Sequence, residues 1–316
     1  MRFAFPPYPH ARTLTRVAMH PMQVDATYLL QLTLNGLMLG LIYALIAVGL
    51  ALVFGVLEII NFAHGELLMV GAYVMAFAVP AFGGQYLPAL LVAVLASALL
   101  GLILYQGFLA RLRDKDFERS ILVTMGISMV LLYGCQYLFS ATPKMVNTEL
   151  GFAGFAVGSI RITWTRVIAA GLAIVAFALL WFILFRTRFG RAMRAVSINR
   201  EAALMVGVRP QAVARNAVIV ATMLCGLAGA ALAPVHLVQP IMGQFLIFKA
   251  FALIIIGGLG SMSGAIVAGI ALGILESWIG GFFDIIWQEV AGFVVMMAVL
   301  LIRPQGLFGQ ASVRTG

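Results

Sequence analysis

The sequence predicts an all-α polytopic membrane protein with about eight to nine transmembrane helices. Five long runs contain no Asp, Glu, Lys or Arg, namely 26–57, 67–110, 120–143, 216–248 and 250–275. Each run meets or exceeds the roughly 20 apolar residues that a helix needs to cross a hydrocarbon core of about 30 Å. The composition agrees, since 63% of the residues are hydrophobic, only 10% are charged and the mean hydropathy is +1.07.

Residues 1–28 are expected to form a flexible leader, because they contain four prolines and no continuous apolar core. A secretory signal would need such a core before its cleavage site. Met22 is an alternative start of the chain, and the first apolar segment then serves as the insertion signal. A transmembrane domain is expected over 29–308, followed by a short tail at 309–316.

The N-terminal half is predicted to hold apolar helices at 29–57, 66–83, 87–110 and 120–140. The first two cannot be one helix, since residues 27–79 would then extend about 80 Å at roughly 1.5 Å per residue. A turn is therefore expected between Glu58 and Glu66. The C-terminal half is predicted to hold further helices at 167–185, 213–235, 246–258, 263–282 and 287–302.

Basic residues gather in two segments between the predicted helices. Seven arginines lie in 186–215 and four basic residues lie in 111–119. Short loops rich in Lys and Arg stay in the cytoplasm during insertion, so both loops are expected there and the segment 141–165 outside. This topology explains the net charge of +9 without a nucleic-acid partner. Counting spans puts the arginine-containing leader outside, against the charge rule, unless an early segment is re-entrant or split.

Asn61, His64 and Glu66 interrupt an otherwise apolar stretch, NFAHGELLMVG at 61–71. One interpretation is a short loop that leaves the bilayer, in which these side chains are hydrated or cap the turn. The other is a translocation path, in which they hydrogen-bond a polar solute or lock a broken helix end. Ionisable groups at membrane depth are costly unless they are paired or hydrated, so these residues are candidates for the substrate path or its gate.

Within the arginine-rich loop, Glu201, Ala202, Ala203 and Gly207 form the pattern E-A-A-x-x-x-G. Ala and Leu favour a short helix, which Gly207 can end in a left-handed conformation, and Pro210 blocks its continuation. Such a helix on the cytoplasmic face suits docking in a groove of another protein. The alternative is an ordinary amphipathic helix at the membrane surface.

Glycines spaced four residues apart indicate close packing of helices in lipid. The pairs are Gly36 with Gly40, Gly260 with Gly264, and Gly269 with Gly273. The alternative for the stretch 257–273 is an unwound segment that lines the pore. Ser261 and Ser263 would then offer hydroxyl groups to the solute.

The remaining charges in apolar surroundings are Lys249, Glu276, Asp284 and Glu289. Lys249 and Glu276 can pair across neighbouring helices. Asp284 and Glu289 are expected to mark an exposed loop between the last two spans. A proton relay would favour a secondary carrier, but one isolated pair is weak support for it.

Three segments, NFAHGELLMVGAY at 61–73, the arginine-rich loop with its E-A-A pattern, and IIIGGLGSMSGAIVAGIALGILE at 254–276, carry a family resemblance. Together they resemble the LivH-type permease subunits of branched-chain amino acid ABC importers, and the likeness extends from about residue 29 to about 308. The resemblance implies ABC importer permease architecture in a bacterial inner membrane. It also implies a LivM-type permease partner, two ATP-binding cassette subunits and a periplasmic solute-binding protein.

The sequence has no nucleotide-binding motif of its own. None of its three lysines, Lys115, Lys144 and Lys249, follows a glycine, so the phosphate-binding loop G-x-x-x-x-G-K-[ST] is absent. ATP is therefore expected to be bound by partner subunits, and the chain is expected to be neither an enzyme nor a cofactor carrier. Cys135, Cys225 and the four histidines show no spacing typical of metal ligands.

The function expected from these features is that of a permease subunit of an ATP-driven importer for branched-chain amino acids, working by alternating access. A permease for urea or short amides is the nearest alternative, because such permeases look similar across the same motifs. An ion-coupled secondary carrier that works alone is a further alternative. A membrane enzyme acting on lipid should show a clustered catalytic set, which the sequence lacks.

Overall fold

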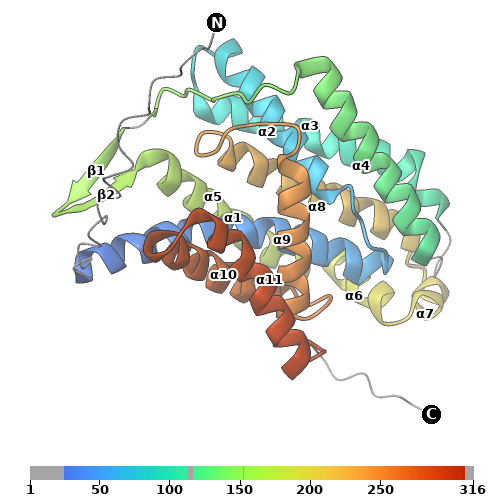
Figure 1. The fold of residues 1–316 in the computed structure, drawn as a ribbon. Coiled ribbons are helices and arrows are strands. Elements are labelled where there is room, and N and C mark those ends of the chain that lie inside the picture. Colours follow the sequence, from blue (N-terminus) through green and yellow to red (C-terminus); the bar gives the residue numbers. More distant parts are fainter. Residues whose placement is uncertain (1–24, 113–116, 152, 310–316) are drawn as a thin grey trace, which may run out of the picture.

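The computed structural model describes residues 25–112, 117–151 and 153–309, and the chain there is mostly helical (Figure 1). The helices are α1 (Ala26–Leu57), α2 (His64–Ala81), α3 (Tyr86–Gly107), α4 (Phe117–Phe139), α5 (Trp164–Arg186), α6 (Arg188–Ile198), α7 (Arg200–Met205), α8 (Pro210–Leu232), α9 (Met242–Gly257), α10 (Met262–Phe282) and α11 (Ile285–Ile302). A 3-10 turn covers Leu109–Arg111, and strands β1 (Gly154–Val157) and β2 (Ile160–Thr163) form an antiparallel hairpin. Most of the predicted leader lies outside the described residues, but residues 26–28 already belong to α1.

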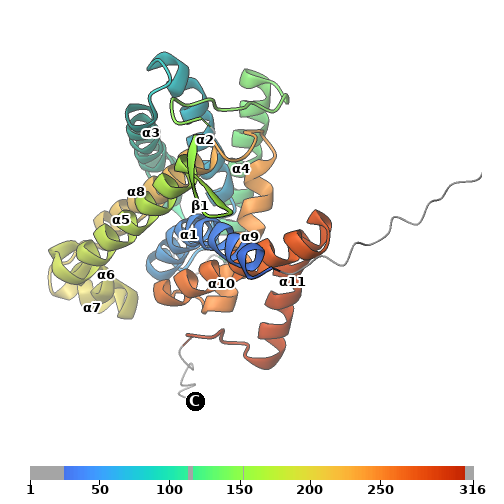
Figure 2. The same ribbon diagram turned by 90° about the vertical axis from the view of Figure 1, so that its left-hand side faces the viewer.

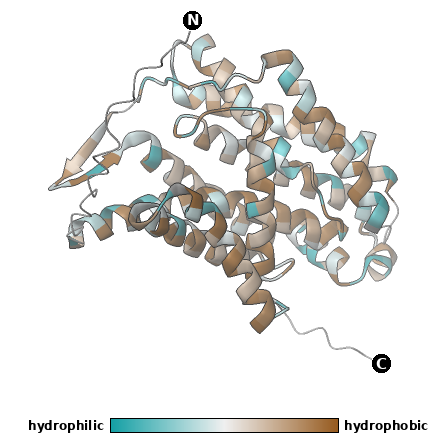
Figure 3. Ribbon diagram, in the orientation of Figure 1, coloured by the Kyte–Doolittle hydropathy of each residue, from teal (hydrophilic) through white to brown (hydrophobic). Residues whose placement is uncertain are grey.

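Each predicted apolar segment is a helix, with ends shifted by a few residues. By length and composition, seven of the described helices can cross a membrane, and α9 and α11 are shorter apolar helices. In Figure 3, much of the helical ribbon has the brown colour of hydrophobic residues. The all-α polytopic membrane fold is therefore confirmed, with seven helices of spanning length and two shorter apolar helices at the nine predicted segments.

The hairpin and α6 were not predicted. Every residue of β1 is exposed, so its sequence carries no alternation of buried and exposed positions. The sequence places the residues of α6 in an arginine-rich loop, yet the Thr187 side chain caps the start of a helix there by accepting a hydrogen bond from the Gly190 N–H at 3.3 Å. Capping of this kind stabilises the start of a helix.

The helix bundle has two ends, which we name the hairpin end and the α6–α7 end. At the hairpin end, the Gln31 side chain on α1 exchanges hydrogen bonds of 2.8 and 2.9 Å with the backbone of Arg161 on β2. At the α6–α7 end, Gly55 of α1 lines a pocket together with Arg194 of α6. α1 therefore runs the length of the bundle. In Figure 2, which looks from the hairpin end, α1 lies in the middle, with α5, α8, α9 and α10 packed around it.

The helix ends that flank the two basic loops lie at the α6–α7 end. The Tyr105 hydroxyl near the end of α3 donates a 2.8 Å hydrogen bond to the Gln211 carbonyl at the start of α8. At the other end, the backbones of Lys144 and Val238 pair through hydrogen bonds of 2.8 and 2.9 Å. The two basic segments therefore share one side, as the count of spans requires. The start of α1 lies on the opposite side of the bundle.

α1 and α10 cross in close contact through four of the predicted packing glycines. A Cβ atom added to Gly40 would lie 2.8 Å from the Gly269 carbonyl oxygen, and one added to Gly36 would lie 2.7 Å from the Gly273 carbonyl oxygen. These distances are too short for any side chain. Only glycine lets the two backbones approach this closely, which strengthens packing where lipid supplies no hydrophobic driving force.

The remaining glycine pair is different. Gly264 packs against Gly257 at the end of α9. The prediction that Gly260 packs helices together is wrong, because Gly260 precedes α10 and no atom lies within 4 Å of an added Cβ. Its φ of +80° shows that it serves a turn, since glycine adopts such a conformation without steric cost.

The connection between α1 and α2 turns back into the bundle. α1 ends where Glu58 takes a left-handed conformation with a φ of 54° and its N–H donates to the Phe54 carbonyl. Residues 58–63 then return inward, and α2 begins beside the middle of α1, where the His64 ring contacts the Ile46 carbonyl. The predicted turn is present, but it is re-entrant.

Candidate functional site

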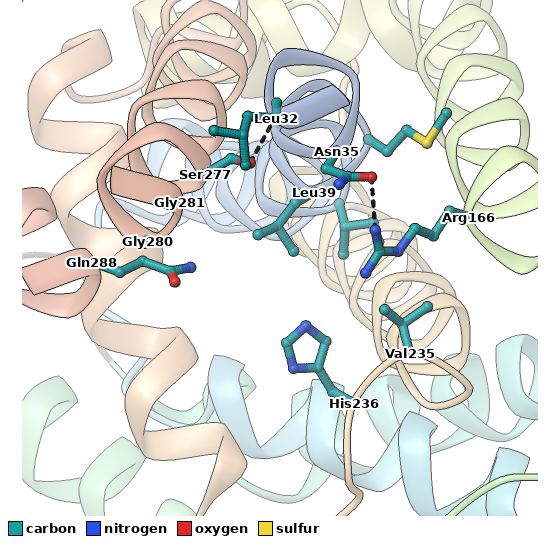
Figure 4. A pocket seen from close by; sticks show the side chains of 12 residues that line it. Leu32, Asn35, Leu39, Arg166, Val235, His236, Ser277, Gly280, Gly281 and Gln288 are labelled. Carbon is teal, nitrogen blue, oxygen red and sulfur yellow. Dashed lines mark hydrogen bonds between the residues drawn. The ribbon is translucent and has the colours of Figure 1, made fainter. Parts of the chain in front are cut away.

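A pocket of about 290 Å³ lies at the hairpin end, between α1, α5, α10, the start of α11 and the loop 233–241 (Figure 4). Its polar lining consists of Asn35, Arg166, His236, Ser277 and Gln288, and its apolar lining of Leu32, Met38, Leu39, Ile42 and Val235. Figure 4 shows that Arg166, His236 and Gln288 extend toward the same space. A cation, an imidazole and an amide thus face one cavity that has an apolar wall.

The Arg166 guanidinium group is held in place by Asn35. Its Nη1 donates a 2.7 Å hydrogen bond to Asn35 Oδ1, which also accepts a 3.3 Å hydrogen bond from Gln31 Nε2. Because Gln31 also binds the backbone of β2, this chain of contacts fixes Arg166 relative to the hairpin. Among the described residues, no carboxylate lies within 4.0 Å of the guanidinium. Arg166 is half-buried, so the pocket contains a positive charge without a counter-ion.

His236 lies in the loop 233–241, and its ring is open to the pocket. Most of its surroundings are nevertheless protein. This desolvation, followed by the positive charges of Arg166 and Lys249, lowers the pKa of His236 below its ordinary value. The imidazole is therefore neutral at neutral pH, with one ring nitrogen available as an acceptor.

Two glycines keep the pocket open. A Cβ atom added to Gly280 would lie 2.7 Å from Oε1 of Gln288, and one added to Gly281 would lie 2.5 Å from Cδ1 of Leu32. A side chain at either position would press on the lining. The pocket volume therefore depends on these two glycines near the end of α10.

A second pocket of about 200 Å³ shares His236 with the first and contains Lys249, Tyr43 and Glu289. Lys249 Nζ donates hydrogen bonds to Glu276 Oε2 at 3.0 Å and to the Tyr43 hydroxyl at 3.1 Å. The predicted pairing of Lys249 with Glu276 is confirmed. The expectation of a loop at Glu289 is wrong, because Glu289 lies on α11, 3.4 Å from Lys249 Nζ.

The predicted polar cluster at the start of α2 is buried and contacts the protein itself. Asn61 Oδ1 accepts a 3.1 Å hydrogen bond from the Ala63 N–H, and His64 Nε2 lies 3.1 Å from the Ile46 carbonyl oxygen and 2.9 Å from Cys225 Sγ. The interpretation of these side chains as hydrated in a loop is wrong, since Asn61 is 3% exposed and His64 is fully buried. These contacts join the re-entrant turn to α1 and α8.

Glu66 is also fully buried. Its Oε1 accepts a 3.2 Å hydrogen bond from Ser128 Oγ, while its Oε2 has no hydrogen-bond partner among the described residues. The carboxyl group packs against Gly243 at the start of α9, where a side chain would collide with it. Glu66 therefore lies where α2, α4 and α9 meet.

The five predicted path residues are not brought together. Ser261 caps α10 by accepting a 3.1 Å hydrogen bond from the Gly264 N–H, and Ser263 is exposed beside it. Gly260, which directly precedes Ser261, lines a pocket with Arg194 of α6. The two serines thus lie at the α6–α7 end, away from the buried cluster on α2, and the 290 Å³ pocket contains none of the five.

The E-A-A pattern forms α7. Asn199 caps its start by accepting a 2.9 Å hydrogen bond from the Ala202 N–H, and Gly207 follows its end with a φ of +83°. Glu201 and Ala202 are exposed, while Ala203 is 3% exposed and faces the bundle. The expected short helix with a left-handed glycine is therefore present at this end.

The residues that line the 290 Å³ pocket were not predicted from the sequence. Asn35 is an amide within an uncharged run, and Arg166 is a lone cation at the edge of an apolar segment. Polar groups at such positions are themselves a signal of function in membrane proteins. Nothing in the sequence indicates that Asn35 and Arg166 are neighbours, because 131 residues separate them in the chain.

Comparisons with known proteins point to the same family that the three sequence segments resemble. The sequence model of the family described as branched-chain amino acid transport system / permease component matches residues 32–302. The chain is 29% identical to the high-affinity branched-chain amino acid transport system permease protein BraD of Pseudomonas aeruginosa, over 90% of this chain and 97% of that protein. It is 27% identical to the permease protein LivH of Escherichia coli strain K12, over 92% and 99%. It is 30% identical to a probable LivH of Methanocaldococcus jannaschii, over 84% and 88%. No solved structure matches the chain significantly.

Proposed function

The chain belongs to the family of branched-chain amino acid transport system permease components, and we therefore propose that it is the permease subunit of an ATP-driven importer for leucine, isoleucine or valine. The observation that carries this proposal is the family match over residues 32–302, which spans nearly all of the described helices. In such an importer, the permease moves the solute by alternating access and does not itself hydrolyse ATP.

Support for an ATPase contact comes from the surface of α7. Beside the exposed Glu201, the side chains of Met205 and Val206 are 89% and 76% exposed, and Ile198 is 86% exposed. An apolar patch with a polar rim is typical of a protein docking site. We assign this patch, with Glu201, Ala202, Ala203 and Gly207, to the contact with an ATP-binding cassette subunit.

The other partners follow from the same assignment. A LivM-type permease would complete the translocation path, and a periplasmic solute-binding protein would deliver the solute at the hairpin end, opposite to the ATPases. The lipid bilayer would be a bacterial inner membrane, with the α6–α7 end in the cytoplasm. The arginines of α6 and its flanking residues agree with that orientation, because basic loops remain cytoplasmic.

The roles in the substrate path or its gate that the sequence suggested for Asn61, His64, Glu66, Ser261 and Ser263 stay predictions. The contacts of Asn61 and His64 favour a part in holding the re-entrant turn. Glu66, with one unpaired carboxylate oxygen, is the member of this set that best suits a moving part.

The experiment that tests the proposed function is uptake by reconstituted vesicles. The complex of this chain with its permease, ATPase and binding-protein partners should accumulate radiolabelled leucine only when ATP is supplied to the ATPase side. Vesicles that contain this chain alone should accumulate none. Uptake by the chain alone would establish a secondary carrier, and ATP-driven uptake of urea without leucine would establish the amide permease.

A further inference from the structure

We propose that the pocket between α1, α5 and α10 is a transient site for a free α-amino acid, in which the Arg166 guanidinium binds the carboxylate. The inference rests on the proposed function, because it names how the transported solute is recognised within the membrane subunit. It goes beyond that function because it names the residue, Arg166, that binds the carboxylate of the solute.

Arg166 is suited to this role because its positive charge has no carboxylate partner within the described part of the chain. One of its five N–H donors binds Asn35 Oδ1, and the others remain available for a planar acceptor. A guanidinium binds a carboxylate through two parallel hydrogen bonds, and such charge-assisted bonds are stronger than neutral ones. Lys249, by contrast, is already paired with the buried Glu276 at 3.0 Å.

The opposite side of the pocket offers acceptors for an ammonium group. Gln288 contributes an amide oxygen, and the neutral imidazole of His236 contributes a ring nitrogen. Both are uncharged, so they can solvate the ammonium group without binding it tightly. A carboxylate in their place would hold the solute more strongly than rapid transfer allows.

The apolar wall of the pocket completes the match to an aliphatic amino acid. Leu39, Ile42 and Val235 line it, and burial of each CH₂ group of the solute there is favourable by about 0.8 kcal/mol. The volume of about 290 Å³ lies at the lower limit of ligand pockets, which range from roughly 300 to 1,000 Å³. The pocket therefore has room for a small zwitterion with a short branched side chain.

The position of the pocket agrees with a site for arriving solute. It lies at the hairpin end, where Asn35 and Gln31 connect it to β2, and the α7 patch lies at the other end of α1. The pocket also shares His236 with the pocket that contains Lys249, so a solute bound at Arg166 would lie next to that second pocket.

Uptake by the reconstituted complex tests the role of Arg166. Arg166→Gln should lower the initial rate of ATP-driven leucine uptake roughly tenfold or more, because it removes a charge-assisted hydrogen bond. Asn35→Asp should have a similar effect with almost no change in size, since the new carboxylate would neutralise Arg166. The matched control is Arg161→Gln on β2, which removes an exposed arginine outside the pocket and should leave uptake unchanged.

A labelling experiment tests binding directly. Gln288→Cys introduces a thiol into the pocket, and the native Cys135 and Cys225 are buried, so they should give little background. Millimolar leucine should slow the reaction of this thiol with a charged thiosulfonate in the purified complex, and leucinol, which lacks the carboxylate, should not. A thiol at the exposed Trp287, outside this pocket, should react at the same rate with or without leucine.

The outcomes separate the two levels of the proposal. Wild-type leucine uptake by Arg166→Gln and Asn35→Asp, or protection by leucinol equal to that by leucine, would overturn the amino-acid site and leave the importer function intact. Failure of the wild-type complex to take up any branched-chain amino acid would overturn the proposed function itself. If Arg166→Gln does not assemble, Asn35→Asp and the labelling of Gln288→Cys still decide the question.

Discussion

The Lys249 ammonium nitrogen lies 3.0 Å from Oε2 of Glu276, inside the helix bundle. The Tyr43 hydroxyl joins this pair by donating a 3.0 Å hydrogen bond to the same carboxylate oxygen. The three residues come from α9, α10 and α1, so one buried network ties together three helices. Lys249 is 7% exposed and Glu276 is fully buried, so the loss of either partner should destabilise the fold strongly.

Lys249→Met should destabilise the protein strongly, because it leaves the Glu276 carboxylate buried and unpaired. Removal of one partner from a buried ion pair typically costs about 3–5 kcal/mol. Thermal unfolding of the purified complex in detergent measures this loss. The double change Lys249→Met with Glu276→Leu should recover much of it, since apolar residues of similar size often replace a buried pair without loss. A double variant no more stable than Lys249→Met would contradict this account.

Glu289→Gln is the control for that series. Its side chain is 53% exposed and lies 3.4 Å from Lys249, so solvent already screens the interaction. The unfolding temperature of this variant should stay close to that of the wild type. A drop as large as that of Lys249→Met would mean that Glu289 is buried in the assembled transporter.

Gly40→Ala should weaken the crossing of α1 and α10. The new methyl group would lie 2.8 Å from the Gly269 carbonyl oxygen and from the Ile270 Cα, and backbone atoms cannot rotate away. Overpacking of this kind costs about 1–3 kcal/mol. Gly55→Ala, in the same helix, has no atom within 4 Å of the added methyl and should be neutral or stabilising by up to about 1 kcal/mol. Equal unfolding temperatures for the two variants would refute the close approach.

Glu201→Lys should separate ATP hydrolysis from transport. It reverses an exposed charge on α7 beside the apolar patch that we assign to the ATPase, so leucine uptake should fall while membrane insertion and helix content stay normal. Glu149→Lys makes the same change at an exposed position at the opposite end of the bundle and should transport normally. Coupled uptake at the wild-type rate by Glu201→Lys would remove this residue from the contact.

His64→Ala distinguishes a structural role from a role in the substrate path. The fully buried ring contacts α1 and α8, so its removal should lower the free energy of unfolding by about 2–4 kcal/mol. Leucine uptake per correctly assembled complex should change little. A variant that keeps its unfolding temperature and loses uptake would show that His64 acts in the path instead.

The sequence predicts an element of the fold well where that element is long and uniformly apolar. The uncharged run 26–57 indicates one long apolar helix, and the predicted helix at 29–57 differs from α1 by only three residues at its start. β1 could not be found, since its four residues are all exposed and its pairing with β2 is set by the surrounding helices. The burial of Asn61 and His64 was equally hidden, because a hydrated loop and a re-entrant turn have the same composition.

The candidate site was the least predictable part. The pattern E-A-A-x-x-x-G identifies α7, because the capping and termination signals are local. Arg166 and Asn35 become neighbours only through the packing of α5 on α1, and no local pattern carries that information. A single sequence therefore indicated that polar groups inside apolar segments are important, but not which of them share a cavity.

α11 has a consequence for the choice of lipid. Its 18 residues rise about 27 Å, a few ångströms less than a typical hydrocarbon core, and it packs mainly on α9 and α10. Its outward side chains, among them Trp287 and Leu301, are exposed. Acyl chains beside α11 must then shorten or tilt to avoid a mismatch. Bilayers of shorter fatty acids should therefore preserve the isolated subunit longest.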